Sequence, residues 1–442
     1  MSRGMVRQAP WGLLDQGLSS GTNLLLTLLV ARELSAQDFG GFSLCYVVYM
    51  LAVGLARATG NRPFTIEHAL SDTTRFREEA RGLLGYSLAF ALVCGLFLMA
   101  AGLASNGPVA TGLLVLAILV PGLLLQDAVR GIFFAQRAAE HACLNDAIWA
   151  VLQLSALAGL LIAVPDPPLW AFLVAWGVPG AVAALCGLLQ LRLVPMQLWR
   201  PRWIKRYRRL SLPLASNLLL TALPAYLLYL AMPALSDLRQ LGILRGAYVF
   251  FGPLNVVFTG VSLVALPAVL RLLASQSGRR LSNQLSLVLG LVAAAWGLLV
   301  VLLPDAAGEA ILGPIWDDTR AARLWLAVSL VAEAVLVGPE TIMSGLGRPA
   351  RMTAVRSIGA GVTLAVGVAL TLTHGAVGAA AGFAIGYWTA AILAVFEASR
   401  LTGILARVQP ESMRVNPLAG SAMIDDGYLA FGATDPADAD RT

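Results

Sequence analysis

The stretch GLLDQGLSSGTNLLLTLLVAR, residues 12–32, has the length and leucine content of a helix that spans a membrane. Six polar side chains nevertheless lie within it, namely Asp15, Gln16, Ser19, Ser20, Asn23 and Thr27. Such groups are costly to leave in hydrocarbon without partners, so they are expected to face something other than lipid. At 100° per residue they occupy an arc of about 140°, which indicates one polar stripe on the helix.

The composition of the 442-residue chain indicates an all-α integral membrane protein. Hydrophobic residues make up 58% of the sequence, charged residues make up 13%, and the mean hydropathy is +0.76. Because a span needs about 20 apolar residues, we expect about twelve transmembrane helices. They lie near 11–31, 40–60, 82–104, 109–134, 143–164, 169–191, 211–233, 243–268, 284–303, 323–345, 354–373 and 376–398.

The arginines predict the orientation, because short cytoplasmic loops retain basic residues. With the N-terminus inside, the cytoplasmic connections carry most of the basic charge, at 62–81, 192–209, 271–280 and 347–356. Both termini are therefore expected in the cytoplasm. This bias explains the net charge of +6 without nucleic-acid binding. Neither the four cysteines nor the three histidines form a ligand pattern, so no metal site or cofactor is expected.

Two segments of the sequence resemble each other and predict an internal duplication. TNLLLTLL at 22–29 recurs as SNLLLTAL at 216–223, and each is followed by Leu-Ser and by a glycine that opens the next span. The two halves hold six spans each, so the repeats are parallel. We expect a six-helix lobe at 1–192, a basic linker at 193–210, a second lobe at 211–400 and a disordered tail at 401–442.

Charged residues inside spans are the main candidates for function. In the eighth span a stripe of about 100° contains Arg245, Tyr248, Gly252, Asn255, Thr259 and Ser262. Such a stripe suits a water-filled cavity or hydrogen bonds between packed helices, and the sequence leaves both open. Arg57 lies on one face with Tyr46 and Tyr49, and Asp127 can pair with Arg130 at i, i+3.

Each of these charges also has a plainer interpretation. Arg57 and Arg130 lie near the inner ends of their spans and can extend to the headgroups. Glu333 lies near the middle of the tenth span, so it is protonated, paired or in contact with water. We take Glu333, Asp15 and Asp127 as candidates for coupling transport to an ion. The alternative for Glu333 is a permanently protonated side chain that is hydrogen-bonded to a neighbouring helix.

Two segments resemble a known family. LLLTLLVARELSAQDFGGFSL (24–44) resembles the first hairpin of the oligosaccharide flippases in the multidrug/oligosaccharidyl-lipid/polysaccharide (MOP) exporter superfamily, and LQDAVRGIFFAQRAAEHACLNDAIWA (125–150) is similar to actinobacterial-type members. The resemblance implies two six-helix lobes around a central cavity in the bacterial cytoplasmic membrane. It also implies transport of a polyprenyl-pyrophosphate-linked oligosaccharide to the outer leaflet, with membrane lipids and glycan-assembly proteins as partners. Family members often have up to fourteen spans, whereas this chain has about twelve.

The residues suit that activity. Arginine forks bind phosphate, and the candidates are Arg57, Arg130 and Arg245. Aromatic rings and amides suit a saccharide, and the candidates are Asn23, Tyr46, Tyr49, Tyr248 and Asn255.

Two other functions compete with the transport of a lipid-linked saccharide. A cation-coupled multidrug antiporter of the same fold would favour a cavity rich in carboxylates and poor in arginine. A membrane glycan polymerase or ligase would need a sizeable outer loop with acid and base groups, and the longest outer connection, 304–318, is short. We therefore expect no enzyme activity and no catalytic residues.

The predicted topology can be tested with reporter fusions. Because basic loops stay in the cytoplasm, fusions after residues 106, 166, 238, 310 and 375 should report an external location. Fusions within 62–80, 193–209 and 272–282 should report a cytoplasmic one. An external reporter at 193–209 would contradict the topology.

Overall fold

The computed structural model describes residues 3–68, 73–195, 201–254, 257–258, 260–261 and 276–408. Helices form almost all of this part of the chain. The first half contains α1 (Arg3–Glu33), α2 (Ala36–Ala56), α3 (Arg62–His68), α4 (Thr73–Ala104), α5 (Gly107–Ala135), α6 (Ala139–Ala163) and α7 (Leu169–Leu191). The second contains α8 (Pro201–Thr221), α9 (Leu223–Leu235), α10 (Leu238–Val249), α12 (Gln276–Val301), α13 (Asp305–Leu312), α14 (Arg320–Gly345) and α15 (Pro349–Val408).

The long helix α15 consists of two antiparallel spans. At Gly375 the backbone has φ 53° and ψ −128°, which interrupts the helix. After this turn, Gly378 lies against the backbone of Leu370 and Gly382 against that of Gly367, so the two halves run in opposite directions. Glycines permit this close approach of two helix backbones. The predicted spans 354–373 and 376–398 are therefore the two halves of α15.

The spans agree with the predicted twelve-helix arrangement. Within the described residues, eight helices are long and apolar enough to cross a membrane, and the bent pair α8 and α9 would form a ninth span. The second half of α15 and the more polar α1 add two more. α10 takes the place of the eighth span, and most of its expected continuation, including Asn255, lies outside the described residues.

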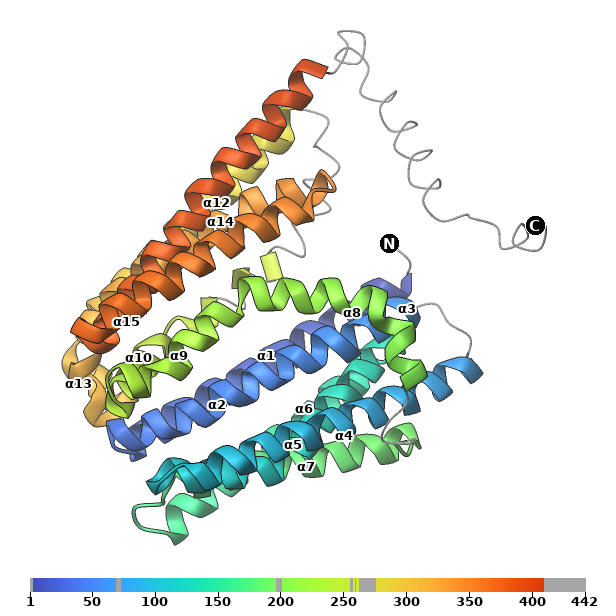
Figure 1. Ribbon diagram of the computed structural model, residues 1–442, viewed down its shortest axis with the longest axis vertical. Coiled ribbons are helices and arrows are strands. Elements are labelled where there is room, and N and C mark those ends of the chain that lie inside the picture. The colour runs from blue at the N-terminus through green and yellow to red at the C-terminus, as the bar shows by residue number, and fades with distance from the viewer. Residues whose placement is uncertain are drawn as a thin grey trace.

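Two groups of helices form two lobes (Figure 1). α1, α2 and α4 to α7 share one apolar core and form the N-lobe together with α3, which packs on α4 and α5. α9, α10, α12, α14 and α15 share another core and form the C-lobe. The lobes converge at the end that holds α13, which we call the opposite end. They spread apart at the end that holds α3 and the N-terminus, which we call the basic end (Figure 1).

At the opposite end the lobes meet through two glycines at the first turns of α2 and α10. A Cβ atom at Gly40 would overlap the carbonyl oxygen of Leu238, and one at Gly242 would overlap that of Ala36. Each obstructing carbonyl lies one turn before the other glycine, so the contact is symmetric. This symmetry agrees with the predicted duplication.

The N-caps of the two helices also match. The Ser35 side chain accepts a hydrogen bond from the Asp38 amide at the start of α2. At the start of α10, the Asp237 side chain accepts one from the Gln240 amide. Both are capping residues that satisfy a free N–H of the first turn. The repeated Leu-Ser segments therefore lead into equivalent helix starts in the two lobes.

The α8 helix belongs partly to each lobe. Its first half covers residues 201–210 of the predicted linker, and Trp203 and Tyr207 pack there with Phe64 and Leu83 of the N-lobe. Its second half reaches the C-lobe, where the Thr353 hydroxyl donates to the side-chain Oδ1 of Asn217 at 2.8 Å. A bend of 49° separates α8 from α9. The predicted linker is therefore largely helical where the structure describes it.

The glycine contact can be tested by adding a single methyl group. Gly40→Ala should weaken the closed opposite end, because the new Cβ would overlap the Leu238 carbonyl. A cysteine introduced at the buried Ala31 should then react faster with a maleimide. Gly21→Ala is the matched control, because no atom lies within 4 Å of its Cβ position. Equal labelling rates in the two variants would contradict the contact.

Candidate functional site

Five charged residues of the N-lobe form ion pairs between helices. The Arg57 guanidinium donates to Oδ1 of Asp127 from Nε at 2.8 Å and from Nη2 at 2.5 Å. Arg130 donates to Oδ2 of Asp15, and its Nε lies 3.2 Å from Oδ2 of Asp146. Asp127 and Arg130 therefore do not form the i, i+3 pair that the sequence suggested. Each binds a partner on another helix instead, which ties α1, α2, α5 and α6 together.

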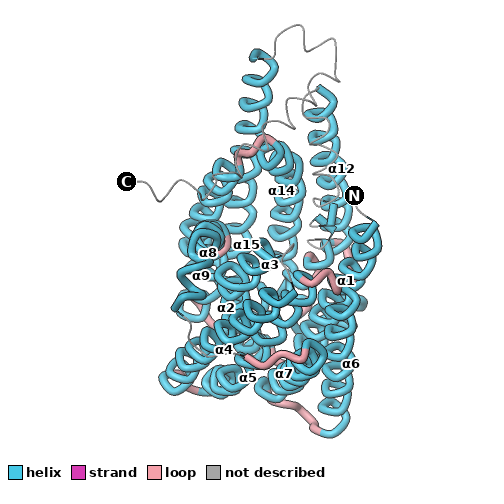
Figure 2. Tube along the Cα trace, turned by 90° about the vertical axis from the view of Figure 1, so that its right-hand side faces the viewer, coloured by secondary structure: helices cyan, strands magenta, loops and turns pink. Residues whose placement is uncertain are grey.

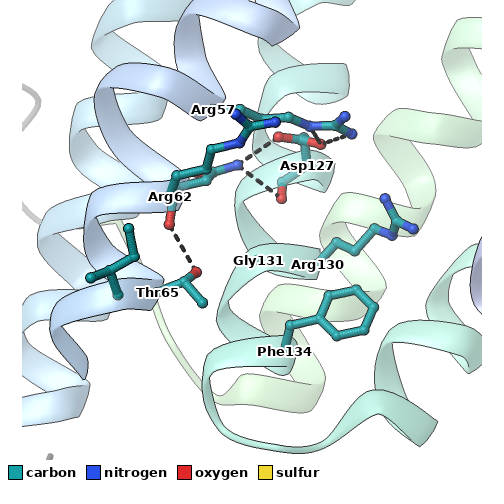
Figure 3. Close-up of a pocket in the computed structure, with 9 residues that line it drawn as sticks. Arg57, Arg62, Thr65, Asp127, Arg130, Gly131 and Phe134 are labelled. Atoms are coloured by element: carbon teal, nitrogen blue, oxygen red, sulfur yellow. Dashed lines mark hydrogen bonds and ion pairs between the residues drawn. The ribbon is translucent and has the colours of Figure 1, made fainter. Parts of the chain in front are cut away.

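A π-helical turn, Arg57–Asn61, follows α2 and positions the first of these pairs. Asn61 points toward α5 and donates from Nδ2 to Oδ2 of Asp127 at 2.5 Å and to its carbonyl oxygen at 3.2 Å. Asp127 thus receives hydrogen bonds from both ends of the turn (Figure 3). Such π-turns occur often at functional sites. Sequence analysis missed Asn61, although Gly-Asn-Arg-Pro at the end of a span was a signal.

Two buried amides extend the network. Gln126 donates from Nε2 to Oδ1 of Asp146 at 2.7 Å, and Asn145 donates from Nδ2 to the Ala183 carbonyl at 2.7 Å. Asp146 and these amides were also missed. An amide followed by an aspartate occurs in two successive spans, at 126–127 and 145–146, and this repetition was the available signal.

The polar stripe of α1 faces several environments. Asp15 is fully buried toward Arg130, and its Oδ1 has no hydrogen-bond partner among the described residues. Gln16 is exposed and donates to the Ser20 hydroxyl at 3.1 Å. The Thr27 hydroxyl donates to the carbonyl of Asn23 one turn earlier, while Asn23 itself is half-buried. Asp15, the charged residue of the stripe, therefore belongs to the ion-pair network, whereas the Thr27 hydroxyl forms its hydrogen bond within α1.

A cavity of about 290 Å³ lies beside the network in the N-lobe (Figure 3). Its lining contains three arginines, Arg57, Arg62 and Arg130, and one carboxylate, Asp127. The side chain of Arg57 is 43% exposed and that of Arg130 is 15% exposed. Arg130 also stacks on Phe134, 5.5 Å from the ring centre. The cavity therefore offers more positive than negative groups.

Arg245 lies among tyrosines from both lobes. Its guanidinium carbon is 5.9 Å from the ring centre of Tyr46 on α2 and 5.7 Å from those of Tyr229 and Tyr248. Its buried Nε has no hydrogen-bond partner in the structure, and no carboxylate in the described chain forms an ion pair with it. Tyr49 has a different position, because it is 5% exposed and packs in the N-lobe core. Tyr46 and Tyr248 therefore stay candidates, whereas Tyr49 supports the core.

The C-lobe holds a second group of charges that the sequence revealed only in part. Arg356 donates from Nη2 to Oε2 of Glu340 at 2.7 Å. Glu333 makes no hydrogen bond or ion pair within the described residues, and Arg356 and Glu340 are the charged groups that act on it. Arg356 and Tyr387 line a small cavity of about 50 Å³ between α9, α14 and α15. Arg356 was not predicted, although it lies in the basic segment 347–356.

The bridging role of Arg130 predicts a stability effect. Arg130→Lys should lower the free energy of unfolding by about 2 kcal/mol, because one ammonium group cannot replace a fork that serves Asp15 and Asp146. The measurement is the midpoint of thermal unfolding in detergent. Arg351→Lys is the control, because its single contact with Glu397 suits a lysine. Equal midpoints for the two variants would contradict the bridging role.

Comparison with known proteins identifies the fold. An inward-facing structure of a multidrug-resistance MATE-family transporter of the MOP superfamily superposes with a TM-score of 0.70 at 16% identity, over 89% of this chain and 96% of that one. The lipid II flippase MurJ in an inward closed conformation gives 0.66 at 10% identity, over 97% and 94% of the two chains. A MOP superfamily transporter from Pyrococcus furiosus, described by the reverse polarity of its binding pocket, gives 0.59 at 16% identity, over 91% and 96%.

These neighbours are transporters and a flippase, in agreement with the resemblance of residues 24–44. No protein-family model matches the sequence, and the search of curated proteins gives no match. TM-scores of 0.59 to 0.70 over 89% to 97% of this chain establish the fold, although the identities are only 10% to 16%. The chain is a multi-pass membrane protein with the fold of the MOP exporter superfamily.

Proposed function

We propose that this protein is a flippase of the bacterial cytoplasmic membrane, with both termini in the cytoplasm. Its substrate would be a polyprenyl-pyrophosphate-linked oligosaccharide, which it moves from the inner to the outer leaflet for polysaccharide export. The observation that carries this proposal is the excess of arginine around the N-lobe cavity, together with Arg245 between the lobes.

The pairing of Arg57 leaves it able to bind a phosphate. Its Nε and Nη2 both donate to a single oxygen of Asp127, and Nη1 makes no hydrogen bond within the described residues. The side chain is 43% exposed, so this free edge is open to the cavity. Charge-assisted hydrogen bonds from arginine to phosphate are among the strongest available to a protein. Arg57 is therefore the best placed of the predicted forks.

The arrangement of the lobes supports loading from the basic end. The symmetric glycine contact closes the opposite end, and the helices spread apart at the basic end (Figure 1). The basic connections predict that this end faces the cytoplasm. A pyrophosphate head could then enter beside Arg57 while its polyprenyl chain stays in the inner leaflet. Tyr46, Tyr248 and Asn23 are the remaining described candidates for contacts with the sugar.

A multidrug antiporter is the second candidate, and one observation favours it. The N-lobe network holds three aspartates, Asp15, Asp127 and Asp146, but only two arginines. A surplus carboxylate in a partly dry site can bind a proton or another cation. Transport assays with a lipid-linked pyrophosphate and with an organic cation separate the two functions.

The flippase proposal predicts different results for three arginine variants. In vesicles loaded with a fluorescent polyprenyl-pyrophosphate saccharide, Arg57→Ala should slow flipping at least about tenfold, because a charge-assisted phosphate contact is lost. Arg57→Lys should restore part of the rate, because it keeps the charge without the fork. Arg400→Ala is the control, since that side chain is 62% exposed and makes one long ion pair. Normal flipping by Arg57→Ala, or export of an organic cation instead, would refute the proposal.

Glu333 is proposed to couple transport to protons. Arg356 and Glu340 act on it electrostatically, and it in turn acts on Tyr229 and Tyr387. With a pH gradient imposed across the vesicles, Glu333→Gln should lose the gradient-driven part of the rate, because glutamine cannot exchange a proton. Glu340→Gln is the comparison, since Glu340 is held by Arg356. An unchanged gradient dependence in Glu333→Gln would leave that residue with a packing role.

A further inference from the structure

The first half of α8 has one face that is fixed to the N-lobe. Trp203 and Tyr207 are 5% and 1% exposed on this face. The Trp203 ring stacks on Tyr86 with centres 4.8 Å apart, and Tyr207 Oη lies 2.6 Å from Nε2 of His68. These contacts set the rotation of α8 about its own axis.

An ion pair fixes the same rotation. Arg206 donates to Oε1 of Glu67 from Nη2 at 2.8 Å, and its Nη1 donates to Glu79. Because Glu67 lies on α3 and Glu79 on α4, Arg206 joins α8 to two helices of the N-lobe. The residues opposite this face must therefore point away from the lobe.

The opposite face of α8 is basic and apolar at once. It carries Ile204 and Leu212, which are 37% and 64% exposed, and the exposed residues Lys205, Arg208 and Arg209. At 100° per residue these five side chains span about 140°. Within the described part of the chain, the three basic residues form no ion pair or hydrogen bond. Arg206, on the packed face of the same helix, pairs with two carboxylates, so the opposite face differs in having basic residues without acidic partners among the described residues.

The place of this face along the helix matches the depth of lipid headgroups. After Arg209, α8 continues into the apolar stretch 210–221 and then α9. A helix rises 1.5 Å per residue, so the basic residues lie within about 10 Å of the point where the apolar stretch begins. Trp203 and Tyr207 lie at the same level, as aromatic residues do at membrane surfaces. Seen toward the basic end, α8 lies at the edge of the bundle (Figure 2).

We propose that Lys205, Arg208 and Arg209 bind the phosphate groups of anionic phospholipids in the leaflet at the basic end. Ile204 and Leu212 lie between the charges and enter the acyl boundary, as in helices that lie at a membrane surface. Clustered basic residues beside a span attract anionic lipids. The two apolar residues on the same face favour a lipid surface over a nucleic acid or a soluble acidic protein.

Lipid bound here would also act on the neighbouring π-turn. The Ser211 hydroxyl donates to the carbonyl oxygen of Thr59 at 2.8 Å, and the Thr59 hydroxyl accepts from Tyr86 at 2.7 Å. Thr59 lies in the turn Arg57–Asn61, so α8 supports the backbone that presents Arg57. A lipid that holds α8 against the N-lobe therefore stabilises this turn. The lipid site does not depend on which substrate the protein transports.

Native mass spectrometry can measure the lipid affinity directly. The full-length protein in neutral detergent is titrated with phosphatidylglycerol or phosphatidylcholine, and the bound lipids are counted. Wild-type protein should bind phosphatidylglycerol in preference. The test variant combines Lys205→Gln, Arg208→Gln and Arg209→Gln, and its affinity for phosphatidylglycerol should fall about a hundredfold.

A second triple variant controls for the loss of charge. It combines Arg279→Gln, Arg280→Gln and Arg348→Gln, which are exposed residues of the C-lobe, and it should keep the wild-type affinity. Equal losses in the two triple variants would overturn the proposal, as would an unchanged affinity in the first. Unchanged melting in neutral detergent should show that α8 remains packed in both.

A competition experiment separates the lipid from a soluble anion. Inorganic pyrophosphate at the same concentration should not displace phosphatidylglycerol, because it lacks the acyl chains that contact Ile204 and Leu212. Displacement by pyrophosphate would instead assign these three residues to a soluble phosphate ligand and would refute the lipid site.

Discussion

The need to neutralise charge inside a low-dielectric bundle governs the N-lobe. An unpaired charge in hydrocarbon costs several kcal/mol, and Arg130 meets this constraint by binding Asp15 and Asp146 from two other helices. The Asp127 carboxylate accepts hydrogen bonds from Arg57 and Asn61. Four helices are thus held in register by groups that could not remain in the membrane alone. The same network places two arginines at the wall of a cavity, so residues that hold the helices together also line that cavity.

Two attachments of different kinds connect the lobes. At the opposite end, Gly40 and Gly242 bring helix backbones into contact, which leaves no space for a side chain between them. At the basic end, the first half of α8 is fixed to the N-lobe, and beyond a 49° bend α9 packs in the C-lobe core. A relative movement of the lobes would have to separate the glycines and change the bend. Such a movement would therefore change the backbone around Thr221.

The sequence predicts the features that are set within a single helix. It does not predict side-chain pairs that depend on how two helices pack together. Apolar length predicts the spans, including the two halves of α15, and the repeated Leu-Ser segments predict the duplication. A helical wheel, however, gives the direction of Asp127 and Arg130 only relative to their own helix, so the i, i+3 pair was wrong. The contact between Asn61 and Asp127 depends on the extra residue of a π-helical turn, and the helical periodicity of the sequence does not indicate such a turn. Arg356 near Glu333 requires knowing how α14 meets α15.

The hydrogen bonds to Asp127 affect how readily Arg57 could bind the phosphate of the proposed substrate. An arginine that is unpaired before binding would carry a large desolvation cost. Arg57 donates from Nε and Nη2 to the same Asp127 oxygen, Oδ1. Asn61 donates to Oδ2 and to the backbone carbonyl of Asp127. If Arg57 turns toward a phosphate, the Asp127 carboxylate keeps one hydrogen bond, from Asn61 Nδ2 to Oδ2, and its backbone carbonyl keeps the other. Under the proposed function, Arg57 then pairs with the phosphate and the Asp127 carboxylate keeps one neutral donor, which reduces the cost of separating the ion pair.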